Sequence, residues 1–303
     1  MKVIVFGCQQ IAVDFIEYLS ELKDVEIPFV VTYELALDRT YGYKSVMDVA
    51  KDRHLEVITE QDSSLIGRVR DVNPDIIFSV YYRKLFPKEL LAVPRLGCVN
   101  IHPSSLPYYR GPVPTAWMIK NGEKKCGITI HYMDTGMDTG DILVQKEYYI
   151  NDAETGFELY TRVMGLGAGL LQDSFYDIVN DKIKAMPQKG IGSYYGKLCS
   201  KRIIDWQQKA EDITNIIRVY AKPYNSAETT LFNKYVLINK ATPIFDEKYI
   251  MQGTGRIVDI LEGDKLVVSC ADGCIVLEDY EIVPRILKEE RDIYFKIGNR
   301  LGR

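Results

Sequence analysis

The sequence predicts an α/β protein in which a mostly parallel sheet domain is followed by a small β-barrel. Short β-rich runs alternate with helical patterns over the first 150 residues, and short strands alone dominate the last hundred. A length of 303 residues lies at the upper end of what one hydrophobic core organises, which favours two domains. With 47% apolar and 26% charged residues, the composition is that of an ordinary globular chain and disfavours disorder, fibres and coiled coils.

The first domain is predicted from strands that alternate with helices. The apolar run at residues 2–7 ends in glycine, and residues 11–22 repeat apolar side chains at helical spacing. This alternation predicts a Rossmann-like, mostly parallel sheet with helices on both faces. The expected strands are 2–7, 27–32, 56–59, 75–82, 98–101, 127–133 and 141–150, and the expected helices are 11–22, 45–54, 65–72 and 155–179.

The chain changes character after residue 185. Residues 186–193, Met-Pro-Gln-Lys-Gly-Ile-Gly-Ser, are rich in turn formers and are interpreted as a connector. Gly-Asp and Asp-Gly pairs separate several of the short strands that follow, which predicts a small OB-like barrel. We therefore expect a first domain at 1–200 and a barrel domain at 201–303. The latter should contain a helix near 210–220 and strands at 229–232, 235–242, 255–262, 265–269 and 274–282.

Charge and export signals indicate a cytoplasmic protein. The 38 basic and 42 acidic residues give a net charge of −4 and form no basic stripe, which disfavours nucleic acid as a partner. The N-terminal apolar run is too short for a signal peptide, and no apolar run reaches the length of about 18 residues that crosses a bilayer. The six cysteines are scattered, as in reduced proteins. Cys270 and Cys274 are interpreted as the two sides of a hairpin turn, and no metal site is expected.

The turn after the first strand does not fit a dinucleotide site. It reads Phe-Gly-Cys-Gln-Gln over residues 6–10 and contains only the first glycine of G-x-G-x-x-G. Without the second glycine the backbone cannot approach a pyrophosphate closely, which disfavours a nicotinamide dehydrogenase. The sequence contains no G-x-x-x-x-G-K-[ST] motif either, so a P-loop is excluded.

Three histidines limit the search for a base that works near neutral pH. His54 ends a polar helical stretch, and His131 lies in an alternating strand where a hydrogen-bonded structural role is expected. His102 follows an apolar strand and precedes a Pro-rich turn, so it lies at the edge where open α/β sheets bind ligands. Asn100 comes two residues earlier and points to the same face if the strand continues that far.

A second polar segment, residues 133–141, connects two expected strands with three acids and two glycines. It is interpreted either as a simple polar loop or as the source of a carboxylate for His102; its spacing does not fit a calcium loop. A carboxylate that meets His102 would form a pair of base and orienting group, with Asn100 as the donor to a developing oxyanion. The alternative is a hydrolase with Ser104 or Ser105 as nucleophile, although neither lies in a G-x-S-x-G turn.

These residues carry a resemblance to a known family. Residues 100–107 read Asn-Ile-His-Pro-Ser-Ser-Leu-Pro, and Asp-Thr-Gly at 138–140 begins 36 residues after His102. The pattern resembles the signature of the folate-dependent formyltransferases, which include methionyl-tRNA formyltransferase, glycinamide ribonucleotide transformylase and amino-sugar N-formyltransferases. Residues 78–85 are similar to the domain that formylates UDP-4-amino-4-deoxy-L-arabinose, and residues 203–206, Ile-Ile-Asp-Trp, resemble the entry to the C-terminal barrel of longer members.

The resemblance implies transfer of a formyl group from 10-formyltetrahydrofolate to a primary amine, without a metal. His102 would take the proton of the attacking amine, Asn100 would stabilise the tetrahedral oxyanion, and Asp138 would orient His102. A homodimer is the expectation that comes with the family. The pterin pocket of the family maps onto two segments of this chain, which comprise Lys84, Leu85, Phe86, Asp134, Thr135, Gly136 and Met137.

Charge and length favour an amino-deoxysugar linked to a nucleotide as the acceptor. Glycinamide ribonucleotide transformylase resembles only the first 200 residues, and methionyl-tRNA formyltransferases carry a longer, basic loop where this chain has residues 33–44, with two basic and two acidic residues. Residues 201–303 carry 16 charges of each sign, so this region has no net positive charge with which to bind the phosphates of tRNA. We expect a product used in surface polysaccharide assembly. The alternatives are methionyl-tRNA formyltransferase, a formyl-folate hydrolase and, last, a non-catalytic folate-binding module.

Overall fold

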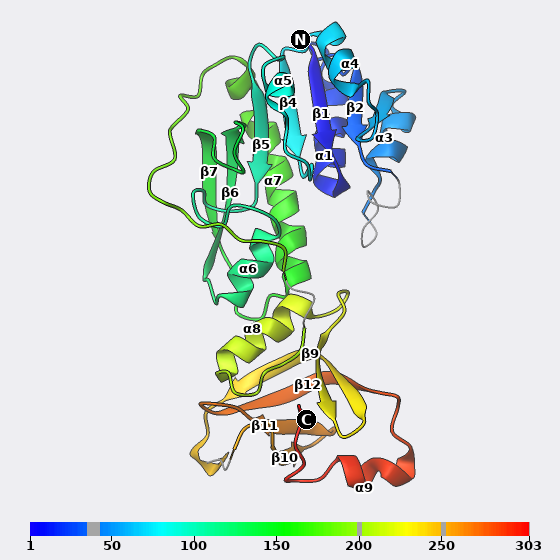
Figure 1. Ribbon diagram of the computed structural model, residues 1–303, viewed down its shortest axis with the longest axis vertical. Helices are drawn as coiled ribbons and strands as arrows, with labels where there is room; N and C mark the ends of the chain where they lie inside the picture. Colours follow the sequence, from blue (N-terminus) through cyan, green and yellow to red (C-terminus); the bar gives the residue numbers. More distant parts are fainter. Residues whose placement is uncertain (35–42, 199–201, 250–252, 303) are drawn as a thin grey trace. The chain divides into compact units, whose positions relative to one another are not determined.

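The computed structural model describes residues 1–34, 43–198, 202–249 and 253–302, which form two compact units (Figure 1). The first unit comprises Met1–Pro114, Cys126–Tyr148 and Thr161–Gly196. The second unit comprises Thr115–Lys125, Tyr149–Tyr160 and Lys197–Arg303, so it includes two short segments that precede the end of the first unit in the sequence. None of the helices in the described ranges is long and apolar enough to cross a membrane.

A seven-stranded sheet with the order β3-β2-β1-β4-β5-β6-β7 forms the centre of the first unit. Strands β1 to β5 pair in parallel, and β6 pairs with β5 in the antiparallel direction. The predicted mostly parallel α/β sheet is therefore confirmed. The strands are β1 (Val3–Gly7), β2 (Phe29–Thr32), β3 (Glu56–Thr59), β4 (Ile76–Val80), β5 (Cys98–His102), β6 (Lys125–Tyr132) and β7 (Ile142–Tyr149).

Helices pack on both faces of this sheet, which is why its central strands are apolar along their whole length. On one face lie α1 (Gln9–Glu21) and α7 (Gly156–Val179), where the ring of Phe15 is 5.0 Å from that of Phe78 on β4. On the other face, α4 (Leu65–Val72) and α5 (Lys88–Leu91) cover the cluster around Phe6. The described residues of this part of the chain also form α3 (Val46–Asp52) and α6 (Pro114–Lys120).

The order of the strands reverses between β1 and β4, because the chain first runs outward to β3 and then returns to the other side of β1. Open α/β sheets bind ligands outside the carboxyl ends of their strands near such a reversal. Gly7, at the end of β1, has a packing role there. A Cβ on Gly7 would lie 2.6 Å from Cβ of Ala12 and 3.0 Å from the carbonyl oxygen of Val80, so glycine lets α1 and β4 approach closely.

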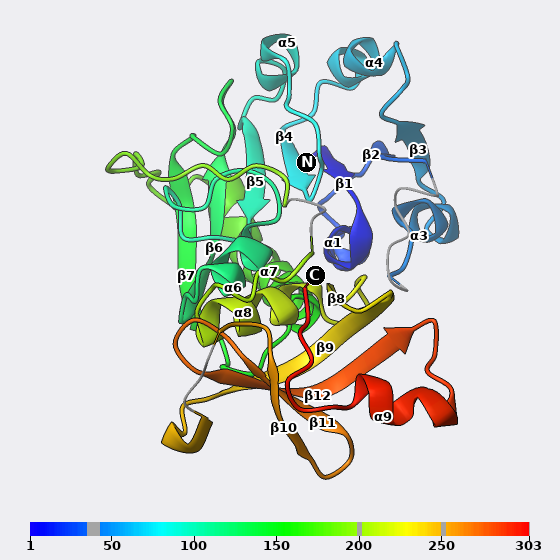
Figure 2. The same cartoon turned by 60° about the horizontal axis from the view of Figure 1, so that its bottom comes forward.

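The second unit contains a five-stranded antiparallel sheet with the order β10-β11-β12-β9-β8. Residues near the C-terminus join its two edges: Leu301 pairs with Leu231 of β8, and Arg300 pairs with Arg256 beside β10. Figure 2 follows this segment from α9 (Arg291–Tyr294) toward β8. The strands are β8 (Ala227–Leu231), β9 (Lys234–Ile244), β10 (Ile257–Leu261), β11 (Lys265–Ser269) and β12 (Cys274–Val283).

The barrel core is covered by α8 (Ala210–Tyr220), whose Ile213 and Ile217 are fully buried. The predicted hairpin turn between the paired cysteines is present, since the N–H of Cys270 donates to the carbonyl of Gly273. The predicted strands and helices occur with ends shifted by a few residues. No apolar pattern predicted α5, α6 and α9. The helices α5 and α9 have four residues each, about one turn, which is too short to repeat such a pattern.

Leu301 closes the barrel and is 1% exposed in its core, so Leu301→Ala should lower the free energy of unfolding of this unit by about 2–5 kcal/mol. Urea denaturation followed by the fluorescence of Trp206, which lies in the same cluster, measures this loss. Ile297→Ala is the matched control, because Ile297 lies four residues away and is 61% exposed. Equal stability of the two variants would contradict the closing role of Leu301.

Candidate active site

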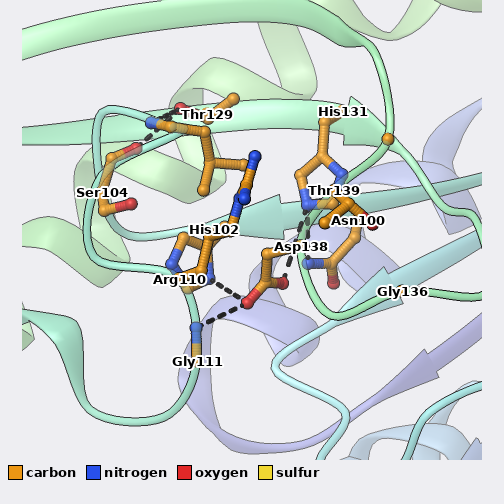
Figure 3. Close-up of polar contacts among 12 residues, drawn as sticks. Asn100, His102, Ser104, Arg110, Gly111, Thr129, His131, Gly136, Asp138 and Thr139 are labelled. Carbon is orange, nitrogen blue, oxygen red and sulfur yellow. Dashed lines mark hydrogen bonds and ion pairs between the residues drawn. The ribbon is translucent and has the colours of Figure 1, made fainter. Parts of the chain in front are cut away.

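Strands β5 and β6 position the central side chains of the site (Figure 3). In the antiparallel register, Asn100 lies opposite His131, and His102 lies opposite Thr129. Residues two apart on a strand share a face. Ile101 points toward α7, where a Cβ on Gly167 would lie 3.1 Å from its Cδ1. Asn100 and His102 therefore project from the opposite face of the sheet.

His102 is buried and has an acceptor on each side of its ring. Its Nε2 lies 2.8 Å from the carbonyl oxygen of Tyr109, and because a carbonyl only accepts, Nε2 carries the proton of the neutral ring. Nδ1 faces Oδ2 of Asp138 at 3.6 Å. A proton taken up at Nδ1 would therefore lie beside a carboxylate, so the fold brings together two residues that are 36 positions apart in the sequence.

The loop that carries Asp138 is held in one shape by its own polar groups. Oδ1 of Asp134 accepts hydrogen bonds from the N–H of Gly136 at 2.9 Å and from the hydroxyl of Thr139 at 2.5 Å. Asp138 has a φ of +55°, and its Oδ2 accepts from the N–H of Gly111 at 2.8 Å. Gly140 is required here, since a Cβ would lie 1.9 Å from the carbonyl oxygen of Tyr132.

His131 is hydrogen-bonded within its strand, as expected, and it also contacts Asn100 of the candidate site. Nδ1 donates to the carbonyl of Tyr132 at 2.7 Å, so the neutral ring presents the lone pair of Nε2 to the Nδ2 group of Asn100 at 3.1 Å. Burial lowers the pKa of His131 to about 4, against the opposing effect of Asp138. The neutral ring therefore holds one N–H of the Asn100 amide and orients the other. The contact between His131 and Asn100 follows from the register of β5 and β6, and local periodicity in the sequence does not contain this register.

The two serines considered as nucleophiles are engaged elsewhere. The hydroxyl of Ser104 donates to the carbonyl of Tyr108 at 2.7 Å, and that of Ser105 donates to Glu147 at 3.4 Å. Neither hydroxyl proton is directed at His102, which argues against a serine hydrolase. His54, as expected, lies exposed at the end of α3.

The segments expected to hold the pterin present both exposed and buried side chains. Leu85 is 59% exposed and Met137 is 41% exposed, and large exposed apolar groups of this kind suit a flat heteroaromatic ligand. Lys84 donates to the carbonyl of Glu60, whereas Phe86 is buried with its ring 4.7 Å from that of Phe6. Over the described residues, no group of three His, Cys, Asp or Glu side chains is arranged to hold a metal ion.

Comparison with known proteins identifies the family. Residues 1–173 match the formyl transferase family, and residues 200–283 match the formyl transferase C-terminal domain. The chain belongs to the formyl transferase family. It is 36% identical over 245 residues to the methionyl-tRNA formyltransferase of Alkaliphilus oremlandii, covering 80% of this chain and 77% of that protein. It is 31% identical over 290 residues to that of Clostridioides difficile, covering 93% and 92%.

Solved structures of similar fold include two proteins described as N-formyltransferases. An N-formyltransferase from Helicobacter canadensis, in complex with folinic acid and dTDP-3-aminofucose, has a TM-score of 0.74 at 24% identity and covers 92% of this chain and 99% of its own. A sugar 3N-formyl transferase solved with dTDP and 5-N-formyl-THF has a TM-score of 0.72 at 21% identity, covering 94% and 99%. The family matches and the relatives identify the chain as a formyltransferase.

The depressed pKa of His131 makes stability depend on pH. The unfolded histidine binds a proton near pH 6.5 and the folded one only near pH 4, so stability should fall as the pH drops from about 6.5 to about 4, by about 3 kcal/mol from this residue. The measurement is the free energy of unfolding against pH for the wild type and for His131→Gln, whose amide oxygen still accepts from Asn100. The wild type should lose more stability over this range; parallel curves would contradict the assignment.

Proposed function

We propose that this enzyme transfers a formyl group from 10-formyltetrahydrofolate to the exocyclic amine of a nucleotide-linked amino-deoxysugar. Asn100, His102 and Asp138 are the proposed catalytic residues. The observation that carries this assignment is the placement of His102 between the carbonyl of Tyr109 and the carboxylate of Asp138, with Asn100 on the same face of β5. A buried base with an adjacent carboxylate and an oriented amide donor meets the needs of acyl transfer to an amine.

In the proposed reaction the amine nitrogen attacks the formyl carbon and forms a tetrahedral intermediate. The free N–H of the Asn100 amide donates to the oxyanion, a kind of contact whose loss costs about 3–4 kcal/mol in other enzymes. Nδ1 of His102 takes the proton of the amine, and Asp138 stabilises the resulting imidazolium. The bond from the formyl carbon to N10 of the folate then breaks, and the imidazolium returns the proton to that nitrogen. The products are an N-formyl sugar and tetrahydrofolate.

The charge distribution of the second unit supports a small acceptor over tRNA. Residues 201–303 have no net charge. In the described part of this region, six basic side chains are within 4.0 Å of acidic partners of the same unit. A cation that is already paired gains little from a phosphate, because it must give up its partner. The pairs are Arg202–Glu228, Lys222–Glu281, Lys234–Glu290, Lys240–Glu278, Lys248–Asp246 and Arg291–Asp264.

Arg218 also forms its hydrogen bonds within this unit. It donates to the backbone carbonyls of Glu154 and Asn151 at 2.9 and 3.0 Å, and burial lowers its pKa. The solved structure of the Helicobacter canadensis protein, which has a fold of this kind, contains folinic acid and dTDP-3-aminofucose. These ligands belong to the two compound classes of the proposed reaction, a formyl folate and a nucleotide-linked amino sugar, which supports the proposal. The six cysteines are scattered along the chain, which fits the proposed cytoplasmic setting.

Methionyl-tRNA formyltransferase is the second candidate, and a specific observation favours it. The curated relatives at 31–36% identity carry that name and align over most of the chain. Residues 33–44 carry two basic and two acidic side chains, and residues 35–42 of this loop lie outside the described residues. The acceptor therefore has to be decided by the reaction itself.

The catalytic assignment predicts severe losses from single substitutions. His102→Asn and Asp138→Ala should each reduce kcat by about 10²–10⁴-fold, the range of general base catalysis, and Asn100→Ala by a similar factor, while folinic acid still binds. Steady-state kinetics and calorimetric titration with folinic acid provide the two readouts. His54→Asn is the control, because His54 is exposed at the end of α3. A rate within threefold of the wild type for His102→Asn would remove the proposed base.

The acceptor is identified by offering the enzyme 10-formyltetrahydrofolate with one acceptor at a time. The panel contains 3-amino and 4-amino nucleotide sugars, including dTDP-3-aminofucose, and initiator Met-tRNA. We expect mass spectrometry to detect a gain of one formyl group on a sugar. Formylation of Met-tRNA alone would overturn the sugar assignment, and release of formate without any acceptor would indicate a hydrolase.

A further inference from the structure

Residues 186–195, which include the connector predicted at 186–193, run alongside both loops of the candidate site. The segment begins with a backbone bridge between Met186 and Ile142, whose N–H and carbonyl groups exchange two hydrogen bonds of 2.8 Å. Ile142 is the first residue of β7 and directly follows the loop that carries Asp138. This bridge places Gln188 beside that loop.

Gln188 uses its whole amide group to join the two loops. Nε2 donates to the carbonyl of Asp138 at 2.9 Å and to the carbonyl of Gly140 at 2.8 Å. Oε1 accepts from Nη2 and Nε of Arg110, at 2.6 and 3.2 Å. Arg110 is 7% exposed and adjoins Gly111, whose N–H donates to the Asp138 carboxylate. A single side chain thus connects the Asp138 loop with the loop that follows His102.

The same segment also holds Tyr109, whose carbonyl accepts the hydrogen bond from Nε2 of His102. Ser193 accepts at its hydroxyl from the N–H of Tyr109 at 2.9 Å and at its carbonyl from the N–H of Arg110 at 2.9 Å. The ring of Tyr195 stacks on that of Tyr109, with centroids 4.7 Å apart. Tyr109 has a φ of +59°, and its carbonyl is the partner of Nε2 of His102.

We propose that Gln188 is a positioning residue of formyl transfer, which fixes the carboxylate of Asp138 beside His102. Asp138 has a left-handed backbone, a state that costs a non-glycine residue about 1 kcal/mol or more and needs support from its surroundings. The two carbonyls that Gln188 holds lie on Asp138 itself and two residues later, so they fix the peptide planes on its C-terminal side. The inference rests on the proposed roles of His102 and Asp138, and is independent of which amine is the acceptor.

The contacts of Gln188 separate this role from simple stabilisation of Arg110. Only the acceptor Oε1 serves Arg110, whereas only the donor Nε2 serves the Asp138 loop. Glutamate at this position keeps the acceptor and gains an ion pair with the buried guanidinium, but it has no N–H for the two carbonyls. Gln188→Glu should therefore keep the fold and lose the positioning.

The experiment compares Gln188→Glu with the wild type, using 10-formyltetrahydrofolate and the acceptor that the wild type formylates in the panel. We expect kcat to fall by about 10- to 100-fold, the effect of a displacement near 1 Å, with KM for folate within about threefold and Tm unchanged or higher. The pH profile of kcat/KM should also change its midpoint. A variant that only reduces the folded fraction would scale the rate equally at every pH.

Two further variants complete the test. Gln188→Met removes donor and acceptor without adding a charge, so it should repeat the loss of kcat and also lower Tm, because Arg110 loses its acceptor. Gln172→Glu is the matched control: its amide also donates to a backbone carbonyl, that of Asp14, and it should retain the wild-type rate. A wild-type kcat and pH midpoint in both folded Gln188 variants would overturn the inference.

Asp138→Asn separates the failure of this inference from failure of the proposed mechanism. If Asp138→Asn keeps the wild-type rate, the carboxylate has no catalytic role and both proposals fall. If Asp138→Asn loses the rate while the Gln188 variants keep it, only the positioning role is wrong. Loss of kcat in Asp138→Asn and in both Gln188 variants, with the control unaffected, supports both.

Discussion

The antiparallel pairing of β5 with β6 is the constraint on which the rest of the candidate site depends. Its register sets Asn100 opposite His131 and His102 opposite Thr129, and all other contacts of the site begin from these positions. Side chains alternate along a strand, so a shift of one residue would turn Asn100 and His102 toward α7. The apolar side of the same strands, packed on α7, excludes that shift, because Ile101 would then leave the core.

The groups that contact His102 beside the β5–β6 pair come from loops with unusual backbone conformations. Tyr109 and Asp138 have positive φ values, and each contributes one of the two groups that contact His102. A non-glycine residue keeps a positive φ only where several contacts with the surrounding structure hold its backbone in place. Here the loops are held from within, through Asp134 and Thr139, and from outside by the segment 186–195. A connector between two folded units thus also supports the site.

Electrostatics distinguishes the two units. In the candidate site, burial keeps His131 neutral. The carboxylate of Asp138 lies beside His102, an arrangement that suits proton transfer to and from an amine. In the second unit, opposite charges pair along the surface of a barrel whose edges are closed by residues near the C-terminus. A surface of paired charges attracts a polyanion weakly.

Local patterns in the sequence determined much of this protein. Apolar periodicity was enough for the sheet, α7 and the five barrel strands, and the spacing of two residues was enough to put Asn100 and His102 on one face. Asp138 was connected to them only by resemblance to a family. Tertiary structure alone brought in His131 and Gln188, and it gave Gly7 a packing role. These residues act through partners that are distant in the chain, across a strand register and between loops, and local periodicity contains no information about such pairs.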